Sequence, residues 1–116
     1  MAKLINLTPH DLTLRDVQGA DHIVPPSGII ARVTTVAGEA ETVAEVPVPV
    51  FGRDSFGKVS GLPEAANDTI LIVSMVVASA LNCTRSDVVR PGTGPQDGAV
   101  RDEQGRIVAV TRLIRA

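Results

Sequence analysis

Aromatic side chains are almost absent from this chain of 116 residues, which holds two Phe, no Tyr and no Trp. Proteins that read RNA or single-stranded bases commonly stack them on aromatic side chains, so this scarcity argues against such a reader. The chain also lacks a basic surplus, because 11 Lys and Arg stand against 13 Asp and Glu. Affinity for duplex nucleic acid comes largely from cations facing phosphates, so we expect no duplex nucleic acid as a partner.

Cysteine and long apolar runs are equally scarce. Cys83 is the single cysteine, so neither an internal disulfide nor a cysteine-based zinc site is expected, and we interpret it as a structural thiol. The longest apolar run, 70–81, has about 12 residues, whereas a membrane-spanning helix needs about 20. The opening segment MAKLINLTPHDLTL contains no apolar core of signal-peptide length. These features predict a cytosolic chain without a membrane partner.

Patterns typical of catalysis are missing as well. His10 and His22 are the only imidazoles, and they do not have the i, i+4 spacing of a metal-binding pair. No GxSxG is present, and Gly92 and Gly94 are not followed by the Lys-Ser/Thr of a phosphate-binding loop. We therefore expect no catalytic residue, no metal and no cofactor. A small enzyme acting on a nucleotide is the least favoured alternative.

Short β-rich segments separated by turn residues fill most of the chain. Residues 4–15 predict two strands flanking a kink at Pro9, and 22–24 and 29–36 predict further strands. The apolar segment 69–73 is typical of a strand buried on both faces, and Ser74 is the predicted N-cap of a helix over 75–81. One longer helix from Ile70 is the alternative. The predicted fold class is α+β and β-dominated, a small antiparallel sheet or barrel-like domain with one principal helix, in a single domain over residues 1–116.

Two apolar segments are long for so small a core. In the segment 43–50, VAEVPVPV, two prolines remove backbone donors, which favours an edge strand or an extended polyproline segment. In 70–81, Ile72 and Val76 are predicted to be interior. Burial of both segments would be more complete in a homo-oligomer, which is the expected state. The glycines of 51–63 predict bends that bring the backbone close to a ligand or a neighbouring strand.

The polar segment 85–101, together with one later arginine, has the composition of a binding site. Its candidate ligand-binding residues are Arg90, Thr93, Gln96, Asp97, Arg101 and Arg112. Arginine forks bind phosphates, Thr and Gln can bond to ribose or base edges, and glycines let backbone amides approach an anion. The alternative is a surface loop whose arginines pair with Asp87, Asp97 and Asp102.

More specific blocks of sequence run through nearly the whole chain. They are NLTPH at 6–10, PPSG and ARV within 25–33, FGKVSGLP at 56–63, ILIVSMVVASAL at 70–81, DVVRPGTGP at 87–95 and VRDEQGRIVAVTRL at 100–113. In this order they resemble a family of small proteins of bacteriophages, prophages and their bacterial hosts. The chain is also similar to the phage Thoeris anti-defence sponges. These are small homo-oligomers that sequester cyclic ADP-ribose isomers, and in some cases cyclic oligonucleotides, used as alarm signals by bacterial immunity.

This resemblance implies a non-catalytic binding protein in the host cytoplasm, with a small cyclic nucleotide as its ligand. By residue type, it implies that the ligand is bound by Arg53, the TGPQD loop and Arg112. It also implies that Phe56 or Phe51 stacks on a base. A phage virion structural or decoration protein is the alternative, because a small β-dominated domain with extended Pro-Val edges suits that role equally well.

Overall fold

Strands are the predominant regular structure, as the sequence predicts. The computed structural model describes residues 3–42, 45, 47–52, 55–82 and 84–116. Its strands are β1 (Lys3–Asn6), β2 (Leu12–Arg15), β3 (Asp21–Val24), β4 (Arg32–Val36), β5 (Ala40–Glu41), β6 (Val50–Phe51), β7 (Ser55–Ser60), β8 (Thr69–Ile72), β9 (Val88–Pro91), β10 (Val100–Arg101), β11 (Ile107–Ala109) and β12 (Leu113–Arg115). Its helices are α1 (Met75–Leu81) and a short 3-10 helix, η1 (Pro95–Asp97). The α+β, β-dominated class with one principal helix is confirmed.

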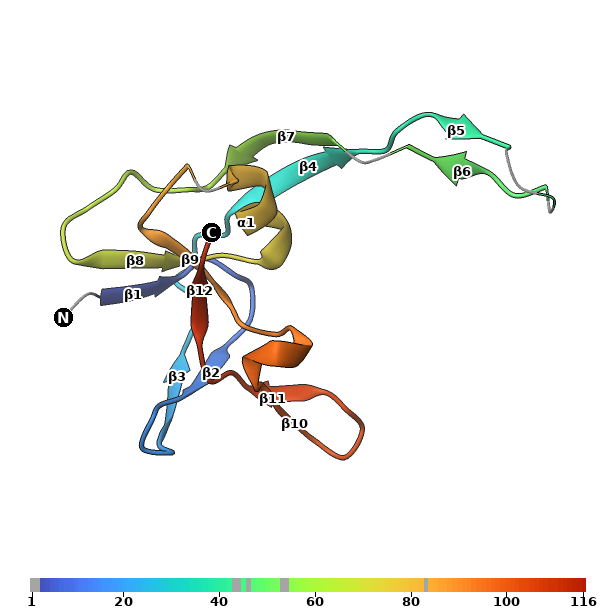
Figure 1. The fold of residues 1–116 in the computed structure, drawn as a ribbon. Coiled ribbons are helices and arrows are strands. Elements are labelled where there is room, and N and C mark those ends of the chain that lie inside the picture. Colours follow the sequence, from blue (N-terminus) through green and yellow to red (C-terminus); the bar gives the residue numbers. More distant parts are fainter. Residues whose placement is uncertain (1–2, 43–44, 46, 53–54, 83) are drawn as a thin grey trace.

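The main sheet has four strands in the order β1–β8–β9–β12 (Figure 1). Strand β8 pairs in parallel with β1 and β9, and β9 pairs antiparallel with β12. Parallel pairing of β8 with β9 is possible because α1 lies between them in sequence and supplies the crossover connection. Antiparallel pairing, predicted for the whole sheet, is found in the ribbons β2–β3, β4–β7, β5–β6 and β10–β11. The main sheet is mixed, and it is open rather than closed into a barrel.

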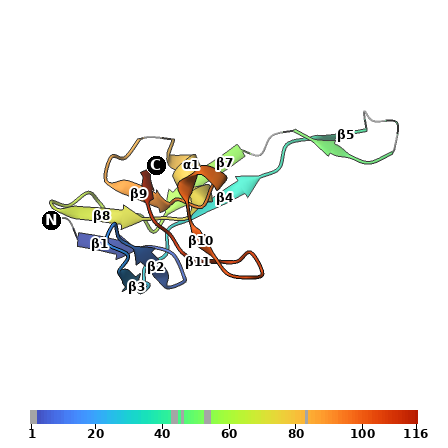
Figure 2. The same cartoon turned by 60° about the horizontal axis from the view of Figure 1, so that its bottom comes forward.

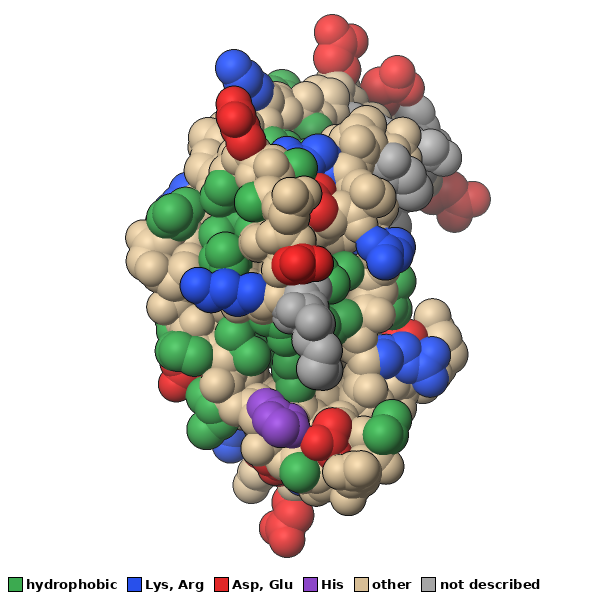
Figure 3. Space-filling model, turned by 90° about the vertical axis from the view of Figure 1, so that its left-hand side faces the viewer, with side chains coloured by type: hydrophobic (Ala, Val, Ile, Leu, Met, Phe, Trp, Pro, Cys, Tyr) green, Lys and Arg blue, Asp and Glu red, His purple; other side chains and the backbone are tan. Residues whose placement is uncertain are grey.

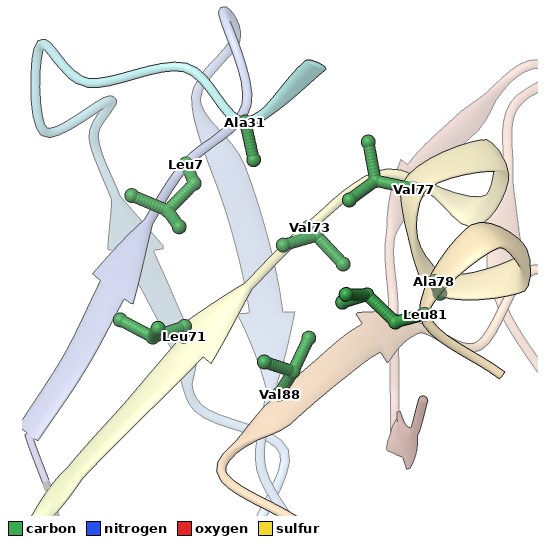
Figure 4. Close-up of a cluster of buried hydrophobic side chains, with 8 residues drawn as sticks. All are labelled: Leu7, Ala31, Leu71, Val73, Val77, Ala78, Leu81 and Val88. Carbon is green, nitrogen blue, oxygen red and sulfur yellow. The ribbon is translucent and has the colours of Figure 1, made fainter. Parts of the chain in front are cut away.

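Strand β8 lies at the centre of the core and is buried on both faces, as predicted. Leu71, Ile72 and Val73 are at most 1% exposed. Figure 4 shows the cluster on the helix side of the sheet, formed by Leu7, Ala31, Leu71, Val73, Val77, Ala78, Leu81 and Val88. Because side chains alternate along a strand, Ile72 points to the opposite face, where its register partner is Val89.

The short helix α1 begins and ends at the predicted residues. Ser74 is the N-cap and its side chain accepts a hydrogen bond from the backbone N of Val77, while Asn82 closes the helix in the left-handed conformation. The prediction for Val76 is wrong, because its side chain is 45% exposed. The buried face of α1 consists of Val77, Ala78 and Leu81, and each helical residue is rotated by about 100° from the next, which turns Val76 away from it.

The NLTPH segment is organised by the amide of Asn6, which is 1% exposed. Its Nδ2 donates to the carbonyl oxygens of His10 (2.8 Å) and Val24 (3.0 Å). Its Oδ1 accepts from the backbone N (2.9 Å) and the hydroxyl (2.6 Å) of Thr8. Asn6 therefore links the end of β1, the kink at Pro9 and the end of β3. These hydrogen bonds give the NLTPH block a structural role.

Strands β4, β5, β6 and β7 form an arm that extends from the rest of the molecule in both views of the ribbon (Figures 1 and 2). Glycines in 51–63 serve close strand contact, since a Cβ at Gly57 would lie 3.3 Å from the carbonyl oxygen of Thr34. The predicted edge segment 43–50 falls partly on residues 43, 44 and 46, outside the described residues; its end, Val50, pairs with Glu41.

Candidate functional site

The TGPQD loop is organised around the carboxylate of Asp97, which is 2% exposed. Its Oδ2 accepts a hydrogen bond from the backbone N of Gly94 (2.8 Å), and its own backbone N donates to the carbonyl of Gly94 (3.0 Å). The hydroxyl of Thr111 donates to the carbonyl oxygen of Asp97 (3.0 Å). Asp97 therefore holds η1 against the segment that precedes β12.

Arg112 contacts this loop through both its side chain and its backbone. Its Nη1 lies 3.8 Å from Oδ1 of Asp97, beyond hydrogen-bond distance, and its side chain is 54% exposed. Its carbonyl oxygen accepts from the backbone N of Gly92 (3.0 Å), and a Cβ at Gly92 would lie 2.7 Å from Cγ of Arg112. Glycine at position 92 therefore lets the Arg112 stem pass close to the loop backbone.

The other candidate residues of the loop bond mainly to the chain itself. Arg101 donates to the carbonyl oxygens of Gly105 (2.8 Å) and Thr93 (3.5 Å). Gln96 is exposed at the surface of η1. Arg90 lies on β9, where its Nη1 donates to the carbonyl oxygen of Pro91 (3.4 Å). The structure thus brings Asp97 close to Arg112 and Arg101 close to Thr93.

The aromatic candidates lie elsewhere. Phe56 belongs to β7 and Phe51 to β6, both strands of the arm. Arg53 lies outside the described residues.

Each aspartate of the surface-loop alternative has an arginine beside it. Arg85 forms a two-pronged hydrogen bond with Asp87 (2.9 and 2.8 Å), which holds the pKa of that carboxyl below its usual value. Asp97 has Arg112 at 3.8 Å, and Asp102 has Arg106 at 3.5 Å. Arg85 also donates to the carbonyl oxygen of Pro63 (3.1 Å). Its guanidinium is therefore occupied by contacts within the chain.

Arg112 also lines a groove of about 390 Å³ between the β2–β3 hairpin and the main sheet; we name it the Arg112 groove. Its lining residues are Leu4, Leu14, Arg15, Asp16, His22, Val24, Val110, Thr111, Arg112 and Leu113. An isolated bridge between Leu14 and Val110 joins its two walls. Figure 3, which faces the side of the molecule with β1 and the hairpin, shows hydrophobic side chains exposed on this face with charged ones among and around them.

An Arg15–Asp21 ion pair and a hydrogen bond between His22 and Asp16 hold the hairpin side of this groove. Arg15 donates through Nε to Asp21 (2.8 Å), and this hydrogen bond lowers the pKa of Asp21 and raises that of Arg15. His22 Nε2 lies 2.7 Å from Oδ2 of Asp16, and this hydrogen bond is the main cause of a lowered pKa at Asp16. Of the two arginines that line the groove, Arg112 therefore has the longer contact with a carboxylate in the described part of the chain.

Sequence reasoning found Arg112 but missed the rest of the groove. Leu4, Leu14 and Val24 belong to three different strands, and in sequence each is an ordinary apolar strand residue. The alternation of Leu12 and Leu14 in β2 is the available signal, since it indicates one apolar face on the hairpin.

Among the residues that the structure describes, no group of three or more His, Cys, Asp or Glu side chains could hold a metal ion. Within the described ranges, no helix has the length and apolar character needed to cross a membrane.

Comparison of the chain with protein-family models, with curated proteins and with solved structures gives no match, so function is inferred from the residues of this chain.

Proposed function

We propose that this chain is a non-catalytic binding protein of the host cytoplasm that sequesters a small cyclic nucleotide of the cyclic ADP-ribose or cyclic oligonucleotide class. The observation that carries the proposal is the Arg112 groove, in which a guanidinium stands at the edge of an apolar wall. A nucleotide offers the matching pair of features, a flat base for the apolar wall and a phosphate for the arginine. The volume of the Arg112 groove, about 390 Å³, is within the usual range of small-molecule sites, roughly 300–1,000 Å³.

Arg112 is suited to the phosphate because little would be lost on binding. Its contact with Asp97 spans 3.8 Å, and its side chain is already half in solvent. Asp97 keeps its hydrogen bond from Gly94 when Arg112 turns to a ligand. Arg15 is held by a 2.8 Å bond to Asp21, so it is not the main phosphate ligand.

Calorimetric titration of cyclic ADP-ribose isomers and cyclic oligonucleotides tests this proposal. We expect Arg112→Ala to weaken binding by about 10–150-fold, because a charge-assisted hydrogen bond contributes roughly 1.5–3 kcal/mol. Arg106→Ala is the matched control, since Arg106 is an exposed arginine with a carboxylate contact of its own that does not line the groove. Equal binding by wild type and Arg112→Ala would remove Arg112 from the site. Absence of binding by the wild type to every compound would overturn the ligand class.

A virion structural or decoration protein is the second candidate, and the arm is the observation that favours it. An extended β-ribbon with exposed apolar side chains is suited to lie along another protein, and Phe51 and Phe56 are 58% and 46% exposed. Mass spectrometry of purified phage particles separates the two roles. Stoichiometric presence in the particle supports the structural role, whereas a chain found only in the infected-cell lysate supports the binding protein.

We also propose that the chain is a homo-oligomer. Apolar side chains on the arm and on α1 remain exposed in a single copy, Met75 by 51% and Val76 by 45%. Burial of such a surface favours association.

A further inference from the structure

A single copy exposes much more surface than a folded monomer of its mass. Its accessible surface is 8075 Å², whereas a compact monomer of 12.1 kDa exposes about 6,000 Å². Its radius of gyration is 17.0 Å, against about 13 Å for a compact domain of this length. The excess, about 2,000 Å², is larger than the roughly 800 Å² that each partner buries in a standard interface.

The arm accounts for this shape. Strands β4 and β7 pair only with each other, so both outer edges of the ribbon carry backbone groups without a strand partner in the described residues. Isolated two-stranded ribbons are at best marginally stable in water. The arm nevertheless exposes Val36, Val50, Phe51 and Phe56, each by between 45% and 58%.

One face of the ribbon continues the core outwards. Val33 and Val59 are cross-strand partners that pack on the core cluster. The next pair along this face is Thr35 and Phe56, because residues two apart on β4 share a side. At the base of the arm, a hollow of about 450 Å³ is lined by β4, Ser60 and α1 residues that include the exposed Val76. Phe56, which is 46% exposed, is the apolar side chain that this face offers to a second ribbon.

Charge differs between the two ends of the arm. The base, where β4 and β7 leave the core, carries the exposed cations Arg32 and Lys58. The tip carries the exposed acids Glu39, Glu41 and Glu45. When two arms lie antiparallel, the acidic tip of one arm meets the positively charged base of the other. Parallel arms would instead bring like charges together.

We infer that two copies of this chain associate through their arms in an antiparallel, two-fold arrangement, with Phe51 and Phe56 buried between them. A two-fold interface uses the same patch on both copies, and the base-to-tip charge pattern is complementary to itself only in this orientation. This inference rests on the proposed homo-oligomer and is independent of the proposed ligand.

Light scattering coupled to size exclusion at high micromolar concentration is the first test. The wild type is expected at an even multiple of 12.1 kDa, and Phe51→Ser with Phe56→Ser at the mass of one copy or of a smaller assembly. The matched control is Val17→Ser with Ile23→Ser, which removes two exposed apolar side chains, 103% and 67% exposed, outside the arm. A monomeric wild type overturns both the homo-oligomer and the inference. An arm variant that associates like the wild type overturns the inference alone.

Charge reversal tests the antiparallel orientation. Arg32→Glu with Lys58→Glu makes base and tip both negative, and Glu39→Lys with Glu41→Lys makes the base and most of the tip positive. We expect each double variant alone to associate at least about tenfold more weakly than the wild type, and an equimolar mixture to regain association. Circular dichroism of each variant confirms the fold. Failure of the mixture to associate better than either variant overturns the antiparallel arrangement.

Discussion

Replacing Ile72 with alanine is expected to lower the free energy of unfolding by about 2–5 kcal/mol. Ile72 is fully buried and lies on the central strand of the main sheet. Truncation removes the transfer free energy of the lost methyl and methylene groups and leaves a cavity, because strands on both sides prevent the site from collapsing. Chemical denaturation monitored by circular dichroism measures the loss.

The matched control for this prediction is Ile23→Ala. Ile23 also lies in a strand, but its side chain is 67% exposed, so the same truncation leaves no cavity and changes stability by less than about 1 kcal/mol. If Ile72→Ala were no more destabilising than Ile23→Ala, the segment 70–81 would be a contact surface rather than the core.

Features that depend on a few neighbouring residues were predictable from the sequence. Ser74 caps α1 because its hydroxyl reaches the backbone N of Val77, three residues on. The turn after β10 needs positive φ at Gly105, which has φ 78°. The aspartate that begins this turn, Asp102, accepts from the backbone N of Gln104 and Arg106 (both 2.9 Å). Such contacts are local, so residue type and spacing determine them.

Pairing between distant segments was not predictable. Lys3 pairs with Thr69, and the β2–β3 hairpin and the arm both lie between them in sequence. Each strand of the main sheet has only three or four residues, and nothing in so short a strand distinguishes a parallel neighbour from an antiparallel one. The helix α1 is the available signal for a parallel pair, since a strand, a helix and a second strand in succession are typical of a crossover.

The candidate site shows the same division. Composition indicated a polar loop rich in arginine, but the hydrogen-bond partners of these arginines depend on the folded geometry. Arg101 donates to a backbone carbonyl, whereas Arg85 donates to Asp87. Arg112 is presented to a groove because the bridge between Leu14 and Val110 brings the hairpin beside it. That contact joins residues nearly a whole chain apart.

Groove and arm occupy different elements, which makes the two proposals separable. The groove is lined by residues of β1, β2, β3 and the segment leading into β12, and the arm is formed by β4 to β7. Arm variants that dissociate the chain but bind nucleotide as the wild type does would place the whole site within one copy. Loss of binding on dissociation would show that the site needs the assembly.

Replacing Asn6 with alanine is expected to lower the free energy of unfolding by about 2–4 kcal/mol. The change removes four hydrogen bonds at once, two donated to the carbonyl oxygens of His10 and Val24 and two accepted from Thr8. Because Asn6 is 1% exposed, water cannot fully replace the lost partners, and each polar group left unpaired and buried adds its desolvation cost. For a domain of this size the loss corresponds to a fall in Tm of about 10–20 °C.

Asn67→Ala is the control for Asn6→Ala. Asn67 is exposed, and only its backbone carbonyl takes part in a hydrogen bond in the described residues, accepting from the hydroxyl of Thr69 (3.2 Å). Its truncation should change Tm by no more than about 2 °C. Asn6→Asp separates the two halves of the network, because it keeps the acceptor for Thr8 and removes the donor for His10 and Val24 while burying a charge. We expect it to be at least as destabilising as Asn6→Ala at neutral pH. A Tm for Asn6→Ala equal to that of Asn67→Ala would mean that the NLTPH block does not stabilise the fold and that its role lies in binding.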